Sequence, residues 1–208
     1  MNKLLMKTAQ NKPNMNSNTA STKASLVDHY RWLRQYGLND SHSGNASCRD
    51  GDTIWVTPTG CCADTLHAEH LVACTLDGHC QANTSQANAS LDAPLHVRVY
   101  QLNTETACVL HSHGPYTLAM TMQGEDFYPI DFEGQYYFDV IPVLNIAFDD
   151  YVAASPEQVA RTLVKYPICV VRGHGIYAQA KTINLAYKWT CTLEHVAKVA
   201  YLTQQAKT

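Results

Sequence analysis

Hydrophobic positions near the start of the chain follow the spacing of a helix. Leu26, Tyr30 and Leu33 fall on one helical face. Ser25 precedes them as a suitable N-cap, and Gly37 follows them as a suitable stop. The pattern therefore predicts a helix that begins at Ser25.

Further along the chain, short apolar runs alternate with amphipathic stretches. Apolar and β-branched runs are typical of strands, whereas helical spacing after a Pro, Ser or Thr is typical of helices. Strands are expected at 53–56, 107–110 and 168–171, and helices at about 92–102, at about 117–122, from 155 and from about 182. Loops are expected at 39–47, 79–89 and 124–134. No internal repeat interrupts this order, so we expect a single α/β domain built in layers.

The first residues differ in composition from the rest. Residues 1–24 are rich in Asn, Lys, Ser and Thr and contain no acidic residue. Such a segment cannot bury much apolar surface, and we expect a mobile tail. The globular domain is then expected to cover residues 25–208.

Composition narrows the class of protein. The chain has 208 residues and a mass of 23.1 kDa, with 46% hydrophobic and 16% charged residues, an ordinary balance for one globular domain. The net charge of -3 and the lack of a basic run argue against a nucleic-acid partner. No apolar stretch approaches the ~20 residues of a membrane span.

The eight cysteines include no C-x-x-C pair, which argues against a zinc ribbon or a thioredoxin-type site. The chain also shows no apolar secretory segment, so we expect reduced thiols in a cytoplasmic protein. The adjacent pair Cys61 and Cys62 remains open as an accessory metal or redox feature.

Three histidines follow the two most apolar expected strands. His111 and His113 come after the apolar run 107–110, and residues two apart on an extended chain project to the same side. His174 follows the run 168–171 between two glycines. Three imidazoles with a further position open are the arrangement of catalytic zinc. H-x-H also ends strands of TIM-barrel hydrolases, but those need roughly 250 residues. The sequence therefore predicts one divalent metal held by the three histidines.

Five motifs in register resemble the class II aldolase/adducin family over about residues 25–205. They are Ser43-Gly44-Asn45-Ala46-Ser47, Thr57-Pro58-Thr59-Gly60, Ser90-Leu91-Asp92, His111-Ser112-His113 and Arg172-Gly173-His174-Gly175. The resemblance implies a layered α/β/α domain with a central, mainly antiparallel sheet flanked by helices. It also implies a homotetramer with active sites at subunit interfaces. The three histidines would bind zinc, with manganese, cobalt or iron as alternatives.

The resemblance also implies a cradle for the phosphate of a sugar-phosphate substrate. In the family aldolases a Gly-Asn pair, a Thr-Gly turn and two serines hold the phosphate. The positions here are Gly44 with Asn45, Thr59 with Gly60, and Ser90. Turns of this composition present N–H and hydroxyl groups to an anion. Leu91 stands where the family has the second serine, so one hydroxyl of the cradle is missing.

Two carboxylates are candidates for proton transfer. Family aldolases have a glutamate at the position of Asp92, which keeps the carboxylate but shortens its reach. Asp92 could act as acid and base, ligate the metal in the resting enzyme, or only cap the helix at Pro94. Family dehydratases acting on methylthioribulose 1-phosphate carry a glutamate in the loop after the H-x-H helix, where this chain has Glu133. Glu133 could equally be a solvated loop residue.

A tyrosine from a neighbouring subunit donates a proton in the family aldolases. The tyrosines near the expected loop and the C-terminal helix are Tyr116, Tyr128, Tyr136, Tyr137 and Tyr177. None of them can be assigned the role, since most tyrosines pack in cores or interfaces.

The leading functional hypothesis is a metal-dependent lyase that cleaves a small sugar phosphate, or a related hydroxy-carbonyl compound, by retro-aldol chemistry through a metal-stabilised enediolate. Dehydration through Glu133 and decarboxylation of a β-keto acid are alternatives on the same site. A different class is a non-catalytic, adducin-like interaction module. Such modules have lost the metal histidines, whereas this chain keeps all three.

Overall fold

The computed structural model describes residues 15–82 and 87–206, and within them the strands form one sheet of eight in the order β4-β3-β2-β1-β5-β8-β7-β6. Neighbouring strands are antiparallel except for β6 and β7, which are parallel. The strands are β1 (Asn45–Asp50), β2 (Thr53–Val56), β3 (Val72–Thr75), β4 (Cys80–Gln81), β5 (Cys108–Ser112), β6 (Val143–Leu144), β7 (Ile168–Val171) and β8 (Gly175–Ala180).

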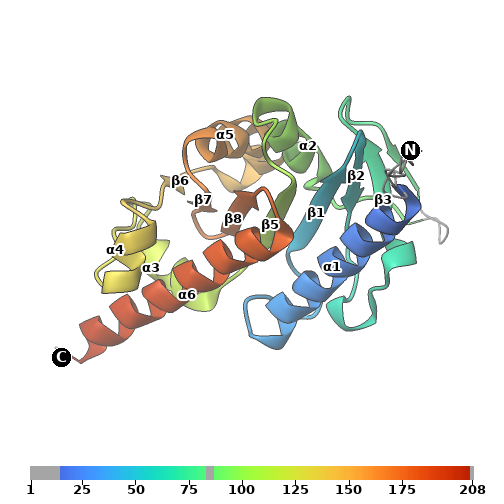
Figure 1. The fold of residues 1–208 in the computed structure, drawn as a ribbon. Helices are drawn as coiled ribbons and strands as arrows, with labels where there is room; N and C mark the ends of the chain where they lie inside the picture. The colour runs from blue at the N-terminus through green and yellow to red at the C-terminus, as the bar shows by residue number, and fades with distance from the viewer. Residues whose placement is uncertain (1–14, 83–86, 207–208) are drawn as a thin grey trace, which may run out of the picture.

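Helices cover both faces of this sheet, with α2 and α5 on one side and α1 and α6 on the other (Figure 1). The helices are α1 (Met15–Gln35), α2 (Ala93–Leu102), α3 (Pro115–Thr121), α4 (Phe132–Tyr137), α5 (Tyr151–Lys165) and α6 (Ile183–Gln205), with short 3-10 turns η1 (Ala63–Thr65), η2 (Ala68–His70) and η3 (Phe148–Asp150). The expected layered α/β/α domain with a mainly antiparallel sheet is confirmed.

Alternation along β5 shows how the sequence separates the two layers. Val109 packs in the core with α2 and α5, whereas Cys108 and Leu110 pack on the opposite face with α1. This is the two-residue period of a strand buried on both faces. His111 continues the period on the side of Val109, which is the side of α2.

Several expected elements are confirmed. The runs 53–56 and 168–171 form β2 and β7, and the helix expected at 92–102 is α2. The last helix begins where expected, because the Thr182 hydroxyl accepts a hydrogen bond from the N–H of Leu185. Strands β1, β3 and β8 were not expected: β1 begins inside the expected loop 39–47, and β4 lies inside the expected loop 79–89.

The expected start of the first helix was wrong. Helix α1 begins at Met15, so Ser25 lies inside it and does not cap it. Contacts with the sheet extend the helix: the Thr19 hydroxyl donates to Asp50, and the Lys23 ammonium lies 4.0 Å from the centre of the Trp55 ring. Of the expected tail, residues 1–14 lie outside the described residues.

Helix α5 also begins earlier than expected. It starts at Tyr151, and Ser155 and Pro156 lie inside it. A proline removes one N–H from the ladder of a helix, which one turn can tolerate when tertiary contacts hold its start. Here the Tyr151 hydroxyl donates a hydrogen bond to the Asp92 carboxylate, which holds the first residue of the helix in place.

The expectation of reduced thiols was wrong for two cysteines. Cys74 and Cys80 form a disulfide. They are direct partners across β3 and β4 with Cα atoms 4.0 Å apart, so the hairpin itself brings the thiols together. The free cysteines are Cys48, Cys108 and Cys169, which are buried, and Cys61, Cys62 and Cys191, which are partly buried. Among the described helices, none is both long and apolar enough to span a bilayer.

Candidate metal centre

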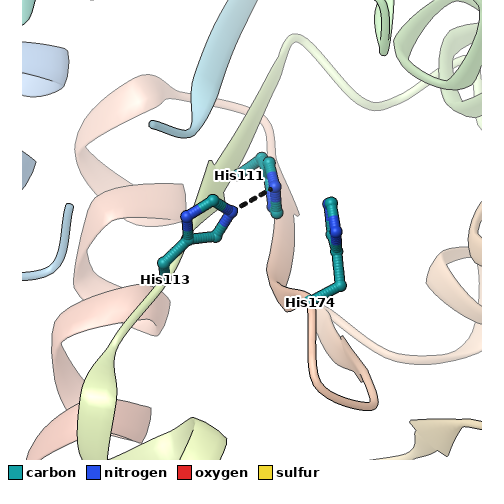
Figure 2. Close-up of side chains that lie close together, drawn as sticks. All are labelled: His111, His113 and His174. Atoms are coloured by element: carbon teal, nitrogen blue, oxygen red, sulfur yellow. Dashed lines mark hydrogen bonds between the residues drawn. The ribbon is translucent and has the colours of Figure 1, made fainter. Parts of the chain in front are cut away.

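The three predicted histidines meet at one end of the central strands (Figure 2). His111 lies on β5, His113 follows the end of that strand, and His174 lies in the turn between β7 and β8. One ring nitrogen from each histidine can be chosen so that all three lie within 4.8 Å of one another. The turn gains its shape from Gly173, which has a φ of +68°, a conformation that favours glycine. Gly175 leaves room for the rings, since a β carbon there would lie 2.6 Å from His113 Cδ2.

Hydrogen bonds orient the imidazoles for metal binding. The Nδ1–H of His111 donates to the carbonyl oxygen of Ile176 over 2.9 Å, which leaves Nε2 with its lone pair for a ligand. That Nε2 lies 2.9 Å from Nε2 of His113. Nε2 of His174 is buried and has no hydrogen-bond partner within residues 15–82 and 87–206. Three convergent ring nitrogens, one of them unpartnered, fit a divalent cation of the kind that imidazole binds.

The surroundings keep the histidines neutral, the form that binds metal. Burial lowers the pKa of His111 well below its usual range, although the nearby Asp92 carboxylate opposes the shift. Burial likewise lowers the pKa of His113, helped by the charge that His174 would carry, and it lowers the pKa of His174. Three neutral imidazoles in a partly buried site are ready to accept a cation.

Aromatic rings hold the histidines in place. The Tyr177 ring lies parallel to the His111 ring with centroids 4.1 Å apart, and the His174 ring is parallel to His111 at 4.8 Å. The Tyr151 ring lies against His174 at 4.3 Å. Parallel packing at these distances fixes ring orientation.

Asp92 lies beside the histidines as a buried carboxylate. Its Oδ2 is 3.9 Å from Nε2 of His111. It accepts hydrogen bonds of 2.9 Å from Nδ2 of Asn45 and from the hydroxyls of Tyr151 and Tyr177. Asp92 occupies the N-cap position of α2, but its side chain makes no capping hydrogen bond, so the interpretation of Asp92 as a mere helix cap was wrong.

The charge balance keeps Asp92 ionised. Burial by itself raises the pKa of this carboxyl, but the positive charge that His111 would carry when protonated and the hydrogen bonds from Asn45 and Tyr177 oppose burial, and the net shift of the pKa is downward. The carboxylate is therefore present at neutral pH as a fixed negative charge next to the histidines.

Residues that the sequence did not single out hold the backbone at His113 and at the start of the helix that follows it. The His113 N–H donates to the side-chain oxygen of Asn39 and to the carbonyl oxygen of Leu38. Glu194 on α6 accepts hydrogen bonds from the N–H groups of Tyr116 and Thr117, at the start of α3. A carboxylate at this place caps the helix and matches its dipole. No local pattern indicates contacts across such distances in sequence.

The residues predicted for a phosphate cradle lie near the same strand ends, and their role stays a prediction. Gly44 and Asn45 lie at the start of β1, and Asn45 pairs with His111 of β5. The Thr59 N–H donates to the carbonyl of Asn88, and the Ser90 N–H donates to that of Thr57, so the two turns lie side by side. Gly60 continues the first turn with a φ of +60°, and Leu91 beside Ser90 is 82% exposed.

Glu133 lies elsewhere on this chain. It is an exposed residue of α4, in a cavity of about 190 Å³ that it shares with Cys191, Thr192, His195 and Val196 of α6. Nothing in these contacts tests a role in dehydration, which stays a prediction.

The fold and the three convergent histidines define an α/β domain with a candidate metal centre, and comparisons with known proteins identify its family. Residues 24–201 match the family described as the class II aldolase and adducin N-terminal domain. The chain belongs to this family. That assignment confirms the resemblance drawn from the five motifs.

Relatives in the family include two kinds of lyase. L-fuculose phosphate aldolase from Methanococcus maripaludis is 27% identical over 166 residues, covering 79% of this chain and 87% of that protein. Methylthioribulose-1-phosphate dehydratase from Marinobacter nauticus is 29% identical over 186 residues, covering 79% and 85%. The crystal structure of L-fuculose-1-phosphate aldolase from Thermus thermophilus superposes with a TM-score of 0.82 at 25% identity, covering 91% of this chain and 98% of that one.

Proposed function

We propose that this protein is a divalent-metal-dependent lyase that cleaves a small sugar phosphate, or a related hydroxy-carbonyl compound, by retro-aldol chemistry. The observation that carries the proposal is the convergence of His111, His113 and His174 beside the ionised Asp92. Relatives named as aldolases support it. The proposed metal is zinc, with manganese, cobalt or iron as alternatives.

The bound cation would supply Lewis acidity, stabilising negative charge on the substrate oxygens as the enediolate develops. Retro-aldol cleavage also requires a group that takes the proton of the substrate hydroxyl as the carbon–carbon bond breaks. Asp92 is ionised and lies next to the histidines, so we assign to Asp92 the role of accepting this proton. Its hydrogen bonds to Asn45, Tyr151 and Tyr177 hold it in place for the transfer.

The substrate phosphate would lie against the cradle of turns. Gly44, Asn45, Thr59, Gly60 and Ser90 would offer N–H, amide and hydroxyl groups to the anion. A homotetramer with active sites at subunit interfaces, located in the cytoplasm, completes the proposal. A neighbouring subunit would then add groups beyond those of a single chain.

Dehydration is the second candidate, and the 29% sequence identity to a methylthioribulose-1-phosphate dehydratase favours it. In that reaction Glu133 would abstract the proton that starts the loss of water. Decarboxylation of a β-keto acid is a further candidate reaction on the same site. The exposed Leu91 favours it, because a leucine at this position removes one hydroxyl from the proposed phosphate cradle.

An activity screen of the metal-loaded protein tests the proposal. The substrates are the 1-phosphates of fuculose, rhamnulose, ribulose and methylthioribulose, with separate detection of aldehyde release and dehydration. Release of dihydroxyacetone phosphate from a ketose 1-phosphate supports the aldolase. A dehydrated diketone product moves the assignment to the dehydratase. A metal-loaded protein that turns over none of them contradicts a sugar-phosphate lyase.

A further inference from the structure

The Asp92 carboxylate lies near the three histidines without joining their cluster. Its Oδ2 is 3.9 Å from Nε2 of His111, yet the group of convergent ligand atoms contains only the histidines among the described residues. A carboxylate in this place has two uses: it can ligate the metal or it can remain free for the substrate. The hydrogen bonds around Asp92 decide between them.

Both oxygens of the carboxylate are already engaged. Oδ1 accepts the hydroxyl of Tyr151, and Oδ2 accepts the hydroxyl of Tyr177 together with the amide of Asn45. The two tyrosine hydroxyls also lie next to each other, and because each carries a single proton they donate at most two hydrogen bonds between them. Turning Oδ2 toward a cation would therefore break the buried hydrogen bonds that Tyr177 and Asn45 donate to it, which is costly in a poorly solvated site.

The two tyrosines cannot follow Asp92 toward the metal, because their rings pack against the ligand rings. Tyr177 is fully buried on β8, with its ring flat against His111. Tyr151 begins α5 and lies against His174. The hydroxyl pair is thus anchored from two elements that differ from the one that carries Asp92.

We propose that the hydroxyls of Tyr151 and Tyr177 hold the Asp92 carboxylate back from the three histidines, so that imidazoles alone bind the metal and Asp92 stays available to the substrate. This inference rests on the metal centre of the proposed function. Tyr151 and Tyr177 are positioning residues, acting through Asp92. The short side chain of Asp92 and the hydroxyls of Tyr151 and Tyr177 would then both keep one coordination position of the metal open.

Cobalt(II) is the probe, because its visible absorption spectrum reports the number and type of ligands. The variants are Tyr151→Phe, Tyr177→Phe and the double variant, each with and without Asp92→Asn. Phenylalanine keeps the ring packing and removes only the hydroxyl. Tyr128→Phe, at a tyrosine that is 64% exposed, is the matched control.

In the wild-type chain, Asp92→Asn should leave the shape of the cobalt spectrum unchanged. In the double phenylalanine variant, the freed carboxylate should add a ligand, alter the spectrum and tighten cobalt binding by about tenfold, the size of effect that groups around metal ligands commonly have. Adding Asp92→Asn to that variant should restore the wild-type spectrum. This thermodynamic cycle separates ligation by Asp92 from its charge alone.

Two results would overturn the role of the tyrosines: a wild-type spectrum that changes with Asp92→Asn, or a double variant whose spectrum matches that of the wild type. If the double variant does not fold, Tyr151→Phe alone should show the same change at smaller amplitude. A wild-type chain that takes up no cobalt would contradict the metal centre and the proposed function together, whereas the first two results leave that function standing.

Discussion

The backbone of Gly44 lies directly against the carbonyl oxygen of His111, so closely that a β carbon on Gly44 would stand 2.6 Å from that oxygen. Gly44 also has a φ of +71°, which side chains other than hydrogen rarely adopt. A residue proposed for the phosphate cradle and one proposed as a metal ligand therefore share one tight backbone contact.

Replacing Gly44 by alanine should lower the free energy of unfolding by about 2–4 kcal/mol, from backbone strain plus the clash with β5. Urea unfolding measures the change. Gly51→Ala is the matched control, because Gly51 has a φ of +59° but nothing within 4 Å of its β-carbon position. Equal losses of unfolding free energy in the two variants would show that the close contacts of Gly44 with His111 and Asn39 contribute nothing.

Substitutions of the two carboxylates should separate the proposed reactions. If Asp92 moves the proton of an aldol cleavage, Asp92→Asn should retain metal and lose turnover by about 100-fold or more, the usual size of a general base effect. Glu133→Gln should then keep its activity. Steady-state kinetics on the substrate found in the screen measures both. The reverse pattern would assign the proton transfer to Glu133 and support dehydration.

Glu194 should stabilise the segment that follows His113. Glu194→Ala removes the acceptor for two N–H groups of α3 and should lower the free energy of unfolding by about 1–2 kcal/mol. Glu194→Gln should lose less, because it keeps one oxygen acceptor. The control is Glu125→Ala, at an exposed position. Unfolding curves that coincide for the two alanine variants would show that the cap is unimportant.

The buried His96 should make the metal-free protein less stable in acid. Burial lowers the pKa of His96 to about 4 from an ordinary value of 6.5, and its Nδ1 is 2.7 Å from the Ser47 hydroxyl. Above pH 6.5 the ring is neutral in both the folded and the unfolded chain. As pH falls from 6.5 to about 4, only the unfolded chain gains the proton, so the free energy of unfolding decreases.

The contribution of His96 is on the order of 3 kcal/mol over this pH range. Urea unfolding at pH 7 and pH 4.5, in the presence of a chelator, measures it. His96→Gln removes the titrating ring and should show a correspondingly weaker pH dependence. An unchanged pH dependence in that variant would contradict the assignment of the effect to His96.

The three histidines of the candidate metal centre could be predicted from sequence because each depends on local pattern. An apolar run followed by H-x-H indicates a strand that delivers two imidazoles to the same side, and Gly173 and Gly175 mark a turn around His174. The family motifs then relate the two strands. The structure places these side chains together as predicted.

The surroundings of the site could not be predicted, because they depend on pairing between distant segments. Strand β1 reads Asn-Ala-Ser-Cys-Arg-Asp, which lacks the β-branched residues that mark a strand, yet it pairs with β2 and β5. Tyr151 reaches Asp92 from a helix whose start the proline at 156 obscured. Glu194 contacts the start of α3 from helix α6, and 78 residues separate it in the chain from Tyr116, whose N–H it accepts.

The central claim is that His111, His113 and His174 hold one divalent metal, and elemental analysis of purified protein tests it most directly. The wild-type chain should contain about one ion per chain, as expected for a three-histidine site. His195→Ala, at an exposed histidine of α6, should contain the same amount. His113→Ala should remain folded and contain almost none. A full metal complement in folded His113→Ala, or none in the wild-type chain, would contradict the claim.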